Sequence, residues 1–287
     1  MDFTPDFLLN KIPAGRWVRN LVEFLTDNFD EQFRFFSGAV EWMIQSALDL
    51  FGSIPPLILI AAITGFAYFF HRSWKTAAGI LLSLLLVLNL GYWQQTVETV
   101  TLVFFATLIC VVFGVPIGIV AAHRRWLFTF IRPILDLMQT IPTFVYLIPT
   151  LMLFGLGMVP GLISTVIFAI PAPIRLTYLG ITGVPRHLID AGQAFGASRM
   201  QLLMKVELPH AMPTIMAGLT QCIMLSLSMV VIAALVGADG LGKPVIRALN
   251  SVNIAQGFEA GLAIVIVAII MDRMLKQPNI TPSGERK

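Results

Sequence analysis

The hydrophobic pattern of this chain changes near residue 50, after which long apolar stretches without Asp, Glu, Lys or Arg follow one another. The longest stretch, 137–174, has 38 residues, and its glycine-rich segment 155–161 is typical of a turn between two helices. Because a helix needs about 20 apolar residues to cross a bilayer, the pattern predicts a polytopic all-α membrane protein with about seven transmembrane helices. These helices are expected near residues 52–70, 76–94, 98–122, 134–155, 160–181, 211–236 and 257–275.

Composition agrees with a membrane protein and excludes a soluble enzyme, a disordered protein and a disulfide-rich secreted domain. Hydrophobic residues make up 57% of the chain and charged residues 12%, and the mean hydropathy is +0.83. Soluble domains have about 45–50% apolar and about 25% charged residues. The net charge of only +3, without a long basic run, gives no reason to expect nucleic acid as a partner. Cys110 and Cys222 lie within apolar runs and are expected to be packing residues.

The first 50 residues differ from the rest, since they contain eight of the 16 acidic residues together with several aromatic residues. Six apolar positions repeat at helical spacing and are expected to form one face of a helix: Phe33, Phe36, Val40, Met43, Ile44 and Ala47. We interpret residues 1–51 as an amphipathic extramembrane or interfacial segment in contact with the lipid bilayer. Residues 52–92 would form two accessory membrane helices, 93–275 the main bundle and 276–287 a cytoplasmic tail.

The positions of lysine and arginine predict how the chain is oriented in the membrane. If the N-terminus is outside, 13 of the 19 lysines and arginines fall on the cytoplasmic side and six fall outside. Cytoplasmic loops of membrane proteins carry the excess of positive charge. We therefore expect the N-terminus outside and the C-terminus inside.

The most informative segment is 183–210, which lies between the fifth and sixth predicted helices and is too polar to span a membrane. Pro185 can begin a helix here, and Pro209 is expected to end it. Gly192 and Gly196 leave a shallow surface that another protein could approach closely. The alternative, a helix lying on the membrane, would need more lysine and arginine and fewer glycines. Steps of three and four residues, typical of one helical face, separate Leu188, Ala191, Phe195, Ser198, Leu202 and Val206.

This segment resembles the cytoplasmic EAA loop of ABC importer permeases, whose pattern runs Glu-Ala-Ala-x-x-x-Gly and ends in Ile-x-Leu-Pro. The chain has Asp190-Ala191-Gly192, then Gly196, and then Val206-x-Leu208-Pro209 at the family's spacing. Asp190 and Gly192 replace Glu and Ala, which changes the reach of the charge and the local helix propensity. The resemblance implies an ATPase-coupling site that comprises Asp190, Ala191, Gly192, Phe195, Gly196, Arg199, Leu202, Leu208 and Pro209.

Within that contact, Phe195 and Leu202 are expected to act as apolar anchors in a groove of the ATPase. On this interpretation Gly196→Leu would block binding by a steric clash and leave insertion into the membrane intact. The polar rim of the contact would be formed by Asp190, Arg199, Lys205 and Glu207.

The resemblance continues outside the loop, because segments 138–147, 174–177, 212–218 and 227–233 are similar to the permease of glycine betaine/proline betaine importers. It implies a type-I ABC importer permease bundle in the bacterial inner membrane. The implied partners are a second copy of the chain as a homodimer, two cytoplasmic ABC ATPase subunits and an external substrate-binding protein. ATP and Mg²⁺ would bind to the ATPase, so this chain is expected to be non-catalytic and to bind no cofactor or metal.

A permanent cation such as a betaine can be held transiently by aromatic faces and weak dipoles, without a salt bridge. For each candidate residue taken singly, ordinary packing between membrane helices is the more conservative interpretation. The candidate translocation path lies on the fourth and sixth predicted helices and comprises Met138, Gln139, Thr140, Phe144, Tyr146, Ser226, Ser228 and Met229.

Three further patterns have simpler interpretations. Gly114-x-x-x-Gly118 matches a pattern of helix packing in membranes. Asp136 and Arg175 lie near cytoplasmic helix ends, where they could pair across the bundle or form an inner gate, but snorkelling to the interface is the preferred interpretation. Residues 237–243 fit the start of a Walker A loop, but Pro244 stands where Ser or Thr would hold magnesium, so we expect a turn that caps the sixth helix.

The sequence therefore favours the membrane subunit of an ATP-driven importer for a betaine-type quaternary ammonium compound. The same machine acting on choline or carnitine is the alternative within this class. An ATP-independent channel or carrier is a less favoured class, because the EAA-like loop would have no role in it. A membrane-bound enzyme is disfavoured, since no Ser-His-Asp set, carboxylate pair or metal-spaced ligands occur.

Overall fold

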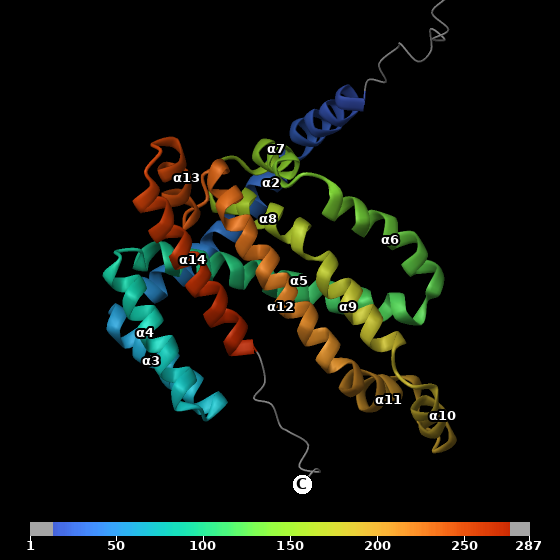
Figure 1. The fold of residues 1–287 in the computed structure, drawn as a ribbon. Helices are drawn as coiled ribbons and strands as arrows, with labels where there is room; N and C mark the ends of the chain where they lie inside the picture. Colours follow the sequence, from blue (N-terminus) through green and yellow to red (C-terminus); the bar gives the residue numbers. More distant parts are fainter. Residues whose placement is uncertain (1–13, 276–287) are drawn as a thin grey trace, which may run out of the picture.

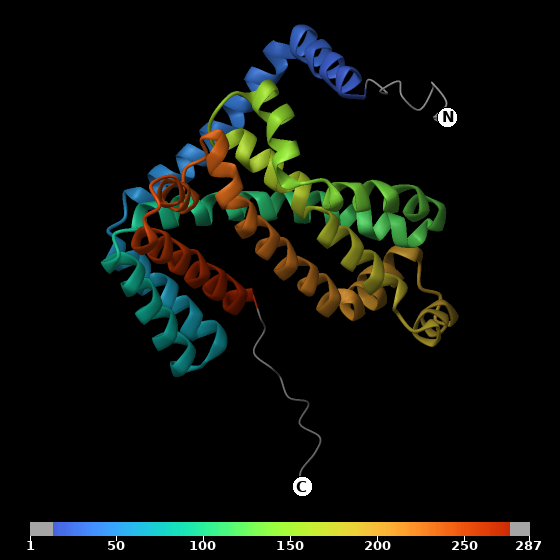
Figure 2. The same ribbon diagram turned by 45° about the horizontal axis from the view of Figure 1, so that its top comes forward.

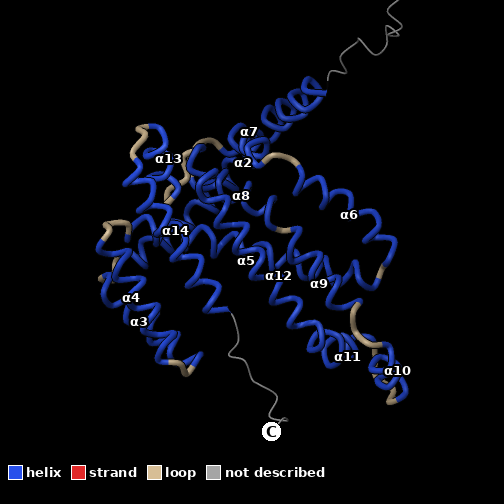
Figure 3. The backbone as a smooth tube through the Cα atoms, viewed as in Figure 1, coloured by secondary structure: helices blue, strands red, loops and turns tan. Residues whose placement is uncertain are grey.

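The computed structural model describes residues 14–275, and every regular element in this range is helical (Figure 3). The predicted tail 276–287 and residues 1–13 of the N-terminal segment lie outside the described residues. For the part that is described, the expectation of an all-α membrane protein is confirmed. The longer helices are α2 (Ala14–Gly52), α3 (Pro56–His71), α4 (Trp74–Asn89), α5 (Trp93–His123), α6 (Arg125–Thr140), α7 (Thr143–Phe154), α8 (Met158–Ala169), α9 (Pro171–Thr182), α12 (Leu208–Ala233), α13 (Gly242–Asn250) and α14 (Ile254–Leu275).

Four helices form the centre of the bundle, where α9 packs against both α5 and α12, and α8 also packs against α12 (Figures 1 and 2). Glycine permits the close contact between α5 and α9. A Cβ atom on Gly118 would lie 2.7 Å from the carbonyl oxygen of Ile174 and 2.7 Å from Thr177 Cβ. At Gly114, one turn earlier, a Cβ atom would meet the ring of Pro173 at 3.0 Å. The Gly114-x-x-x-Gly118 motif is therefore a packing face, because small residues let two helix backbones approach each other.

Four helical units are long and apolar enough to cross a membrane, namely Trp93–His123, Met158–Thr182, Arg199–Val236 and Ile254–Leu275. Two more candidates are helix pairs, α2 with α3 and α6 with α7, which are bent by 97° and 96° at the break. Where about seven spans were expected, the described residues thus have four continuous helical units, two bent pairs and the shorter apolar helix α4.

The predicted span 134–155 is wrong as a single helix, because the chain bends sharply between α6 and α7. Ile141 is extended at this break, with ψ of 130°. Its backbone conformation follows from Pro142, since a proline disfavours the helical region for the residue before it.

The predicted accessory helices are α3 and α4, which pack against each other as a hairpin. Arg72 ends α3 in a left-handed conformation (φ 46°), and the side chain of Ser73 caps α4. Leu84 of α4 and Ile270 of α14 belong to one buried apolar cluster, so the hairpin is attached to the main bundle through α14. Each helix of the hairpin has 16 residues. At 1.5 Å per residue this is about 24 Å, which is shorter than a hydrocarbon core of about 30 Å.

The N-terminal helix α2 is not confined to the surface, because it packs on α5, α7 and α8. Phe29 has a non-helical backbone (φ −128°) and divides α2 into two parts. In the second part, the rings of Phe33 and Phe36 lie 5.4 Å and 6.0 Å from the ring of Phe154 in α7. Ile44 is buried in a cluster with residues of α5 and α8. The apolar face that the sequence predicted is thus the face that contacts the bundle.

Replacing Gly118 with alanine should destabilise the bundle, because the added methyl group would collide with the backbone of α9. Overpacking of this kind costs about 1–3 kcal/mol. The matched control is Gly261→Ala in α14, where nothing lies within 4 Å of an added Cβ atom. We expect a lower midpoint of thermal unfolding for Gly118→Ala than for Gly261→Ala in detergent-purified protein. Equal midpoints would contradict the close packing at Gly118.

Candidate functional site: a two-helix loop continuous with α12

The segment predicted to couple to a partner forms two short helices at one end of the bundle (Figure 1). α10 (Arg186–Ala194) and α11 (Arg199–Leu202) are followed by η1 (Leu203–Glu207), which leads directly into α12. The turn between α3 and α4 and the end of α14 lie at the same end of the molecule (Figures 1 and 2). The structure thus brings together segments that the charge pattern assigned to the cytoplasmic side of the membrane. That this end of the molecule faces the cytoplasm stays a prediction.

The turn between α10 and α11 is built on Gly196, which has a positive φ of 75°. The N–H of Ala197 donates to the carbonyl of Gly192 (3.0 Å), and the N–H of Gly196 donates to that of Gln193 (2.9 Å). This pair of hydrogen bonds is the Schellman motif, which satisfies the last carbonyls of a helix and needs a left-handed residue. The backbone therefore requires a residue here that tolerates the left-handed conformation, in addition to any contact that Gly196 makes with a partner.

The two short helices touch each other at Gly192, where a Cβ atom would lie 2.5 Å from Leu202 Cδ2. Leu202 is only 6% exposed, because its side chain packs inside the loop. The expectation that Leu202 is an apolar anchor for a partner is therefore wrong. On the other side of the turn, Ser198 and Gln201 form a reciprocal capping box that fixes the start of α11.

The outer surface of the loop carries Phe195, which is 93% exposed, as an apolar anchor requires. Asp190 and Arg199 are exposed as well, as expected of a polar rim. Sequence reasoning missed Met200 and Met204, which are 66% and 60% exposed. Their spacing of four residues places them on one helical face and was the signal that could have found them. Exposed aromatic and methionine side chains on one loop are typical of a protein-binding surface.

Pro209 does not end the helical segment, although the sequence predicted that it would. The preceding turn η1 is a π-helix, in which the N–H of Leu208 donates to the carbonyl of Leu203. In a regular α-helix the ring of Pro209 would clash with the carbonyl four residues earlier, and the wider π-turn gives it room. As a result Arg199–Val236 is one helical unit of 38 residues that joins the loop to the centre of the bundle.

A second connection links the loop to α5. Glu207, expected on the polar rim, is only 8% exposed, so that expectation is wrong. Its Oε2 atom lies 2.9 Å from Nε2 of His123, the last residue of α5. The other ring nitrogen, Nδ1 of His123, lies 2.9 Å from the carbonyl oxygen of Ile119. When both nitrogens carry hydrogen, the imidazolium forms an ion pair with Glu207 and holds η1 against α5.

The candidate path residues fall into two groups. Ser226 and Met229 have no exposed surface, and Ser226 Oγ donates to the carbonyl of Cys222 (2.9 Å), so these two are packing residues of α12 within a single chain. Ser228, by contrast, is exposed on α12. At the bend between α6 and α7, Tyr146 Oη donates to the carbonyl of Met138 at 2.6 Å. Gln139 is partly exposed and Thr140 is exposed near this bend, and Phe144 is 56% exposed.

Two side-chain contacts hold α6 to α9. Arg175 Nη2 lies 2.6 Å from Asp136 Oδ1, so these charges pair across the bundle, which was the alternative to the snorkelling interpretation. The rings of Phe128 and Tyr178 stack with centroids 3.5 Å apart and an interplanar angle of 3°. Both contacts bridge helices that are separated in the sequence by the bend, and neither could be assigned from spacing.

The segment 237–243 forms a turn that closes on α5 and α8. The N–H of Leu241 donates to Thr99 Oγ1 (2.8 Å), and the N–H of Asp239 lies 3.0 Å from Met158 Sδ. Lys243 forms an ion pair with Asp239. In a Walker A loop the backbone N–H groups and the lysine would contact phosphate. Here they contact Thr99, Met158 and Asp239, which agrees with a turn that caps the sixth predicted helix.

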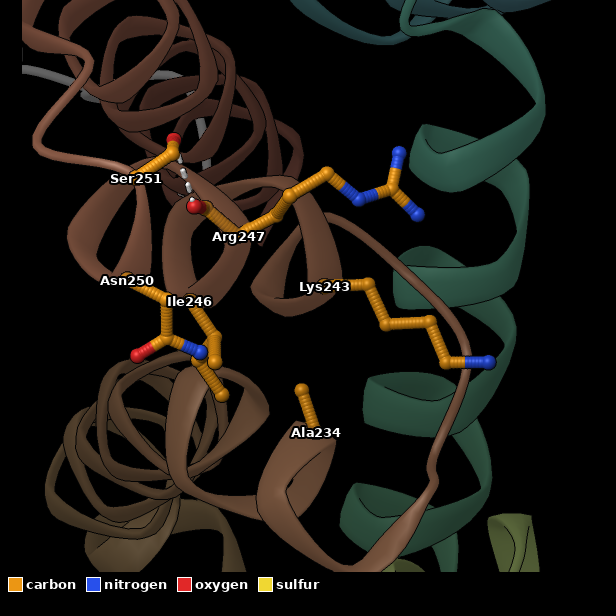
Figure 4. Close-up of a pocket in the computed structure, with 6 residues that line it drawn as sticks. All are labelled: Ala234, Lys243, Ile246, Arg247, Asn250 and Ser251. Atoms are coloured by element: carbon orange, nitrogen blue, oxygen red, sulfur yellow. Dashed lines mark hydrogen bonds between the residues drawn. The ribbon is translucent and has the colours of Figure 1, made fainter.

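Next to this turn, α13 borders an open hollow of about 440 Å³. Figure 4 shows that the side chains of Lys243 and Arg247 extend from α13 toward the same side. The hydroxyl group of Ser251 donates a hydrogen bond to the carbonyl oxygen of Arg247. The remaining lining residues are Ala234, Ile246 and Asn250.

Comparison with known proteins agrees with this arrangement. The sequence model of the family described as "Binding-protein-dependent transport system inner membrane component" matches residues 114–276. The chain is 43% identical over 270 residues to the glycine betaine transport system permease protein OpuAB of Bacillus subtilis, covering 93% of this chain and 94% of that protein. It is 42% identical over 277 residues to the glycine betaine/carnitine transport permease protein GbuB of Listeria monocytogenes, with 96% and 98% coverage.

A third relative is the glycine betaine/proline betaine transport system permease protein ProW of Escherichia coli, 43% identical over 265 residues, with 92% of this chain and 74% of that protein covered. Among solved structures, the inward-facing MetNI methionine ABC transporter superposes with a TM-score of 0.57 at 23% identity, over 64% of this chain and 94% of that chain. The similarity to this transporter structure concerns the fold alone. The chain belongs to the family of inner membrane components of binding-protein-dependent transport systems.

Proposed function

We propose that the chain is the membrane subunit of an ATP-driven importer and that its two-helix loop receives the motion of a separate ATPase. The observation that carries this proposal is the unbroken helical unit from Arg199 to Val236. Because its backbone hydrogen bonds continue from the loop into α12, a force on the loop acts directly on a helix at the centre of the bundle. Phe195, 93% exposed at the turn, provides the apolar side chain that a groove in the partner would bind.

The contact between Glu207 and His123 gives the same force a second route. It ties η1 to the end of α5, which packs closely on α9 through Gly118. A displacement of the loop therefore has to move α5 and α12 together or break the contact between Glu207 and His123. Both helices pack on α9, so the motion would reach the whole centre of the bundle.

The substrate in this proposal is a betaine-type quaternary ammonium compound such as glycine betaine or proline betaine. Its support is the substrate named for three relatives, each of which matches more than nine-tenths of this chain. Phe144, with 56% exposure beside the bend between α6 and α7, offers an aromatic face of the type that attracts such cations. Thr140 and Ser228 add exposed hydroxyl dipoles. Choline and carnitine remain the alternative substrates.

The partners follow from the same proposal. Two copies of the chain would form a homodimer around the path, and two cytoplasmic ATPase subunits would bind the loops and hold ATP and Mg²⁺. An external binding protein would deliver the substrate from the opposite end. This chain would then be a non-catalytic subunit that binds no cofactor itself.

Reconstitution in liposomes with the ATPase and binding-protein partners tests the proposal. We expect ATP hydrolysis and uptake to be stimulated by glycine betaine and proline betaine more than by choline or carnitine.

Phe195→Ala should lower uptake by about tenfold or more, because truncating a central interface anchor costs about 2 kcal/mol or more. The control Phe258→Ala removes a ring of 70% exposure from α14, outside the loop, and should have little effect. Substrate uptake without any ATPase subunit would refute the proposal.

Substitutions at Gly196 separate a backbone requirement from a steric one. Asparagine tolerates the left-handed conformation, whereas a β-branched residue is strongly disfavoured at φ of 75°. We expect Gly196→Asn to retain most of the uptake and Gly196→Val to lose most of it, with both variants inserted in the membrane. If Asn and Val abolish uptake equally, the partner requires the absence of a side chain and the backbone explanation is insufficient.

The buried contact of Glu207 gives a prediction for stability. Removing His123 leaves the buried Glu207 carboxylate without this partner, which destabilises the fold, while replacing both residues with apolar ones is often tolerated. His123→Leu should therefore lower the midpoint of thermal unfolding more than the double variant His123→Leu/Glu207→Leu. If the double variant is the less stable of the two, Glu207 is stabilised by another group and the link to α5 is not its main interaction.

A further inference from the structure

A hollow of about 320 Å³ lies between α4 and α14, apart from the coupling loop and the candidate path. Helix α4 contributes Lys75, Thr76, Gly79 and Ser83, and α14 contributes Ile269 and Arg273. The two helices run side by side, with the start of α4 and the end of α14 at the same end of the molecule as α10 and α11 (Figures 1 and 2).

The hollow is basic at this end. Lys75 and Arg273 both line it, and within residues 14–275 no ion pair engages either side chain. The first turn of α4 begins here, capped by Ser73, so its helix dipole adds positive potential at the same place. Two cations without an ion pair among the described residues, together with a helix N-terminus in the same recess, favour an anion.

Further along the helices the hollow becomes apolar. Ile80, Ile269 and Ile270 line it beyond the basic end, and Gly79 leaves open space beside them, since nothing lies within 4 Å of a Cβ atom there. Trp74, next to Lys75, is 77% exposed, and such tryptophans are enriched at the level of the lipid headgroups. The recess therefore combines an anion-binding end at the membrane surface with apolar walls that run into the bilayer.

We propose that this recess binds an anionic phospholipid, with the phosphate at Lys75 and Arg273 and one acyl chain along Ile80 and Ile269. Thr76, next to Lys75, offers a hydroxyl group to the phosphate oxygens. Basic pockets between membrane helices bind anionic headgroups for these reasons. A soluble phosphate would use only the charged end, and a zwitterionic lipid would gain little from it. The bound lipid would fill the seam by which the α3–α4 hairpin joins α14.

Native mass spectrometry of the detergent-purified full chain can test this proposal, with phosphatidylglycerol or phosphatidylcholine added. We expect the chain to retain phosphatidylglycerol preferentially. Each basic side chain near the headgroups contributes about fivefold in affinity, so Lys75→Gln/Arg273→Gln should weaken retention by about 25-fold. The control Arg124→Gln/Arg125→Gln removes two basic side chains at the junction of α5 and α6 and should leave retention unchanged.

A second pair of variants tests the apolar part. Gly79→Leu would place a side chain in the recess and should lower phosphatidylglycerol retention, whereas Gly65→Leu, also with open space around its Cβ position but on α3, should not. Equal retention of both lipids by the unmodified chain, or equal losses in the test and control variants, would overturn the proposal. Displacement of the lipid by glycerol phosphate at equal concentration would show a soluble-phosphate site and overturn the lipid assignment as well.

Discussion

The close approach of α9 to its two neighbours is the contact on which the remaining structure depends. At Gly118 of α5, and again at Gly180 of α9 and Gly218 of α12, a Cβ atom would lie 2.7–3.0 Å from the nearest atom of the facing helix. Between membrane helices there is no hydrophobic driving force comparable to that in water, so van der Waals contact between backbones has to provide the adhesion. The three helices therefore pack closely within the four-helix centre of the bundle.

This centre explains why the loop is positioned as it is. α12 begins in the loop and ends in the centre, and α5 reaches the loop again through His123. The loop is thus held at two points by helices that are themselves packed on α9. Its inner face is filled by Leu202 against Gly192, while Phe195 stays outside. Such a loop can transmit a force to the bundle because its two short helices pack tightly on each other, while its outer surface is exposed for a partner to contact.

Sequence patterns were sufficient for features that depend on local spacing. The apolar face of α2 at Phe33 and Ile44, the packing role of Gly118 and the position of the loop all follow from periodicity and composition. The same periodicity treated Phe195 and Leu202 as equivalent, although one is exposed and the other buried. The reason is that the left-handed turn at Gly196 reverses the chain, so a single helical repeat no longer describes which side faces outward.

Contacts between distant segments could not be predicted in this way. The pairs Glu207 with His123 and Asp136 with Arg175 depend on how helices cross, and a single sequence does not contain that information. The bend after α6 could be predicted only in part. Pro142 indicates where the helix breaks, but it does not determine the angle of the bend.

The π-turn at η1 has a consequence for how the loop is aimed. Each residue of an α-helix advances the chain by about 100° around the helix axis. One extra residue in a single wide turn therefore rotates the preceding loop by about this angle around the axis of α12. The direction in which Phe195 is presented is therefore adjustable by gaining or losing one residue within Leu203–Glu207. Such a change leaves the faces of α12 that pack on α8 and α9 in register, so the bundle and its docking surface can diverge separately among related sequences.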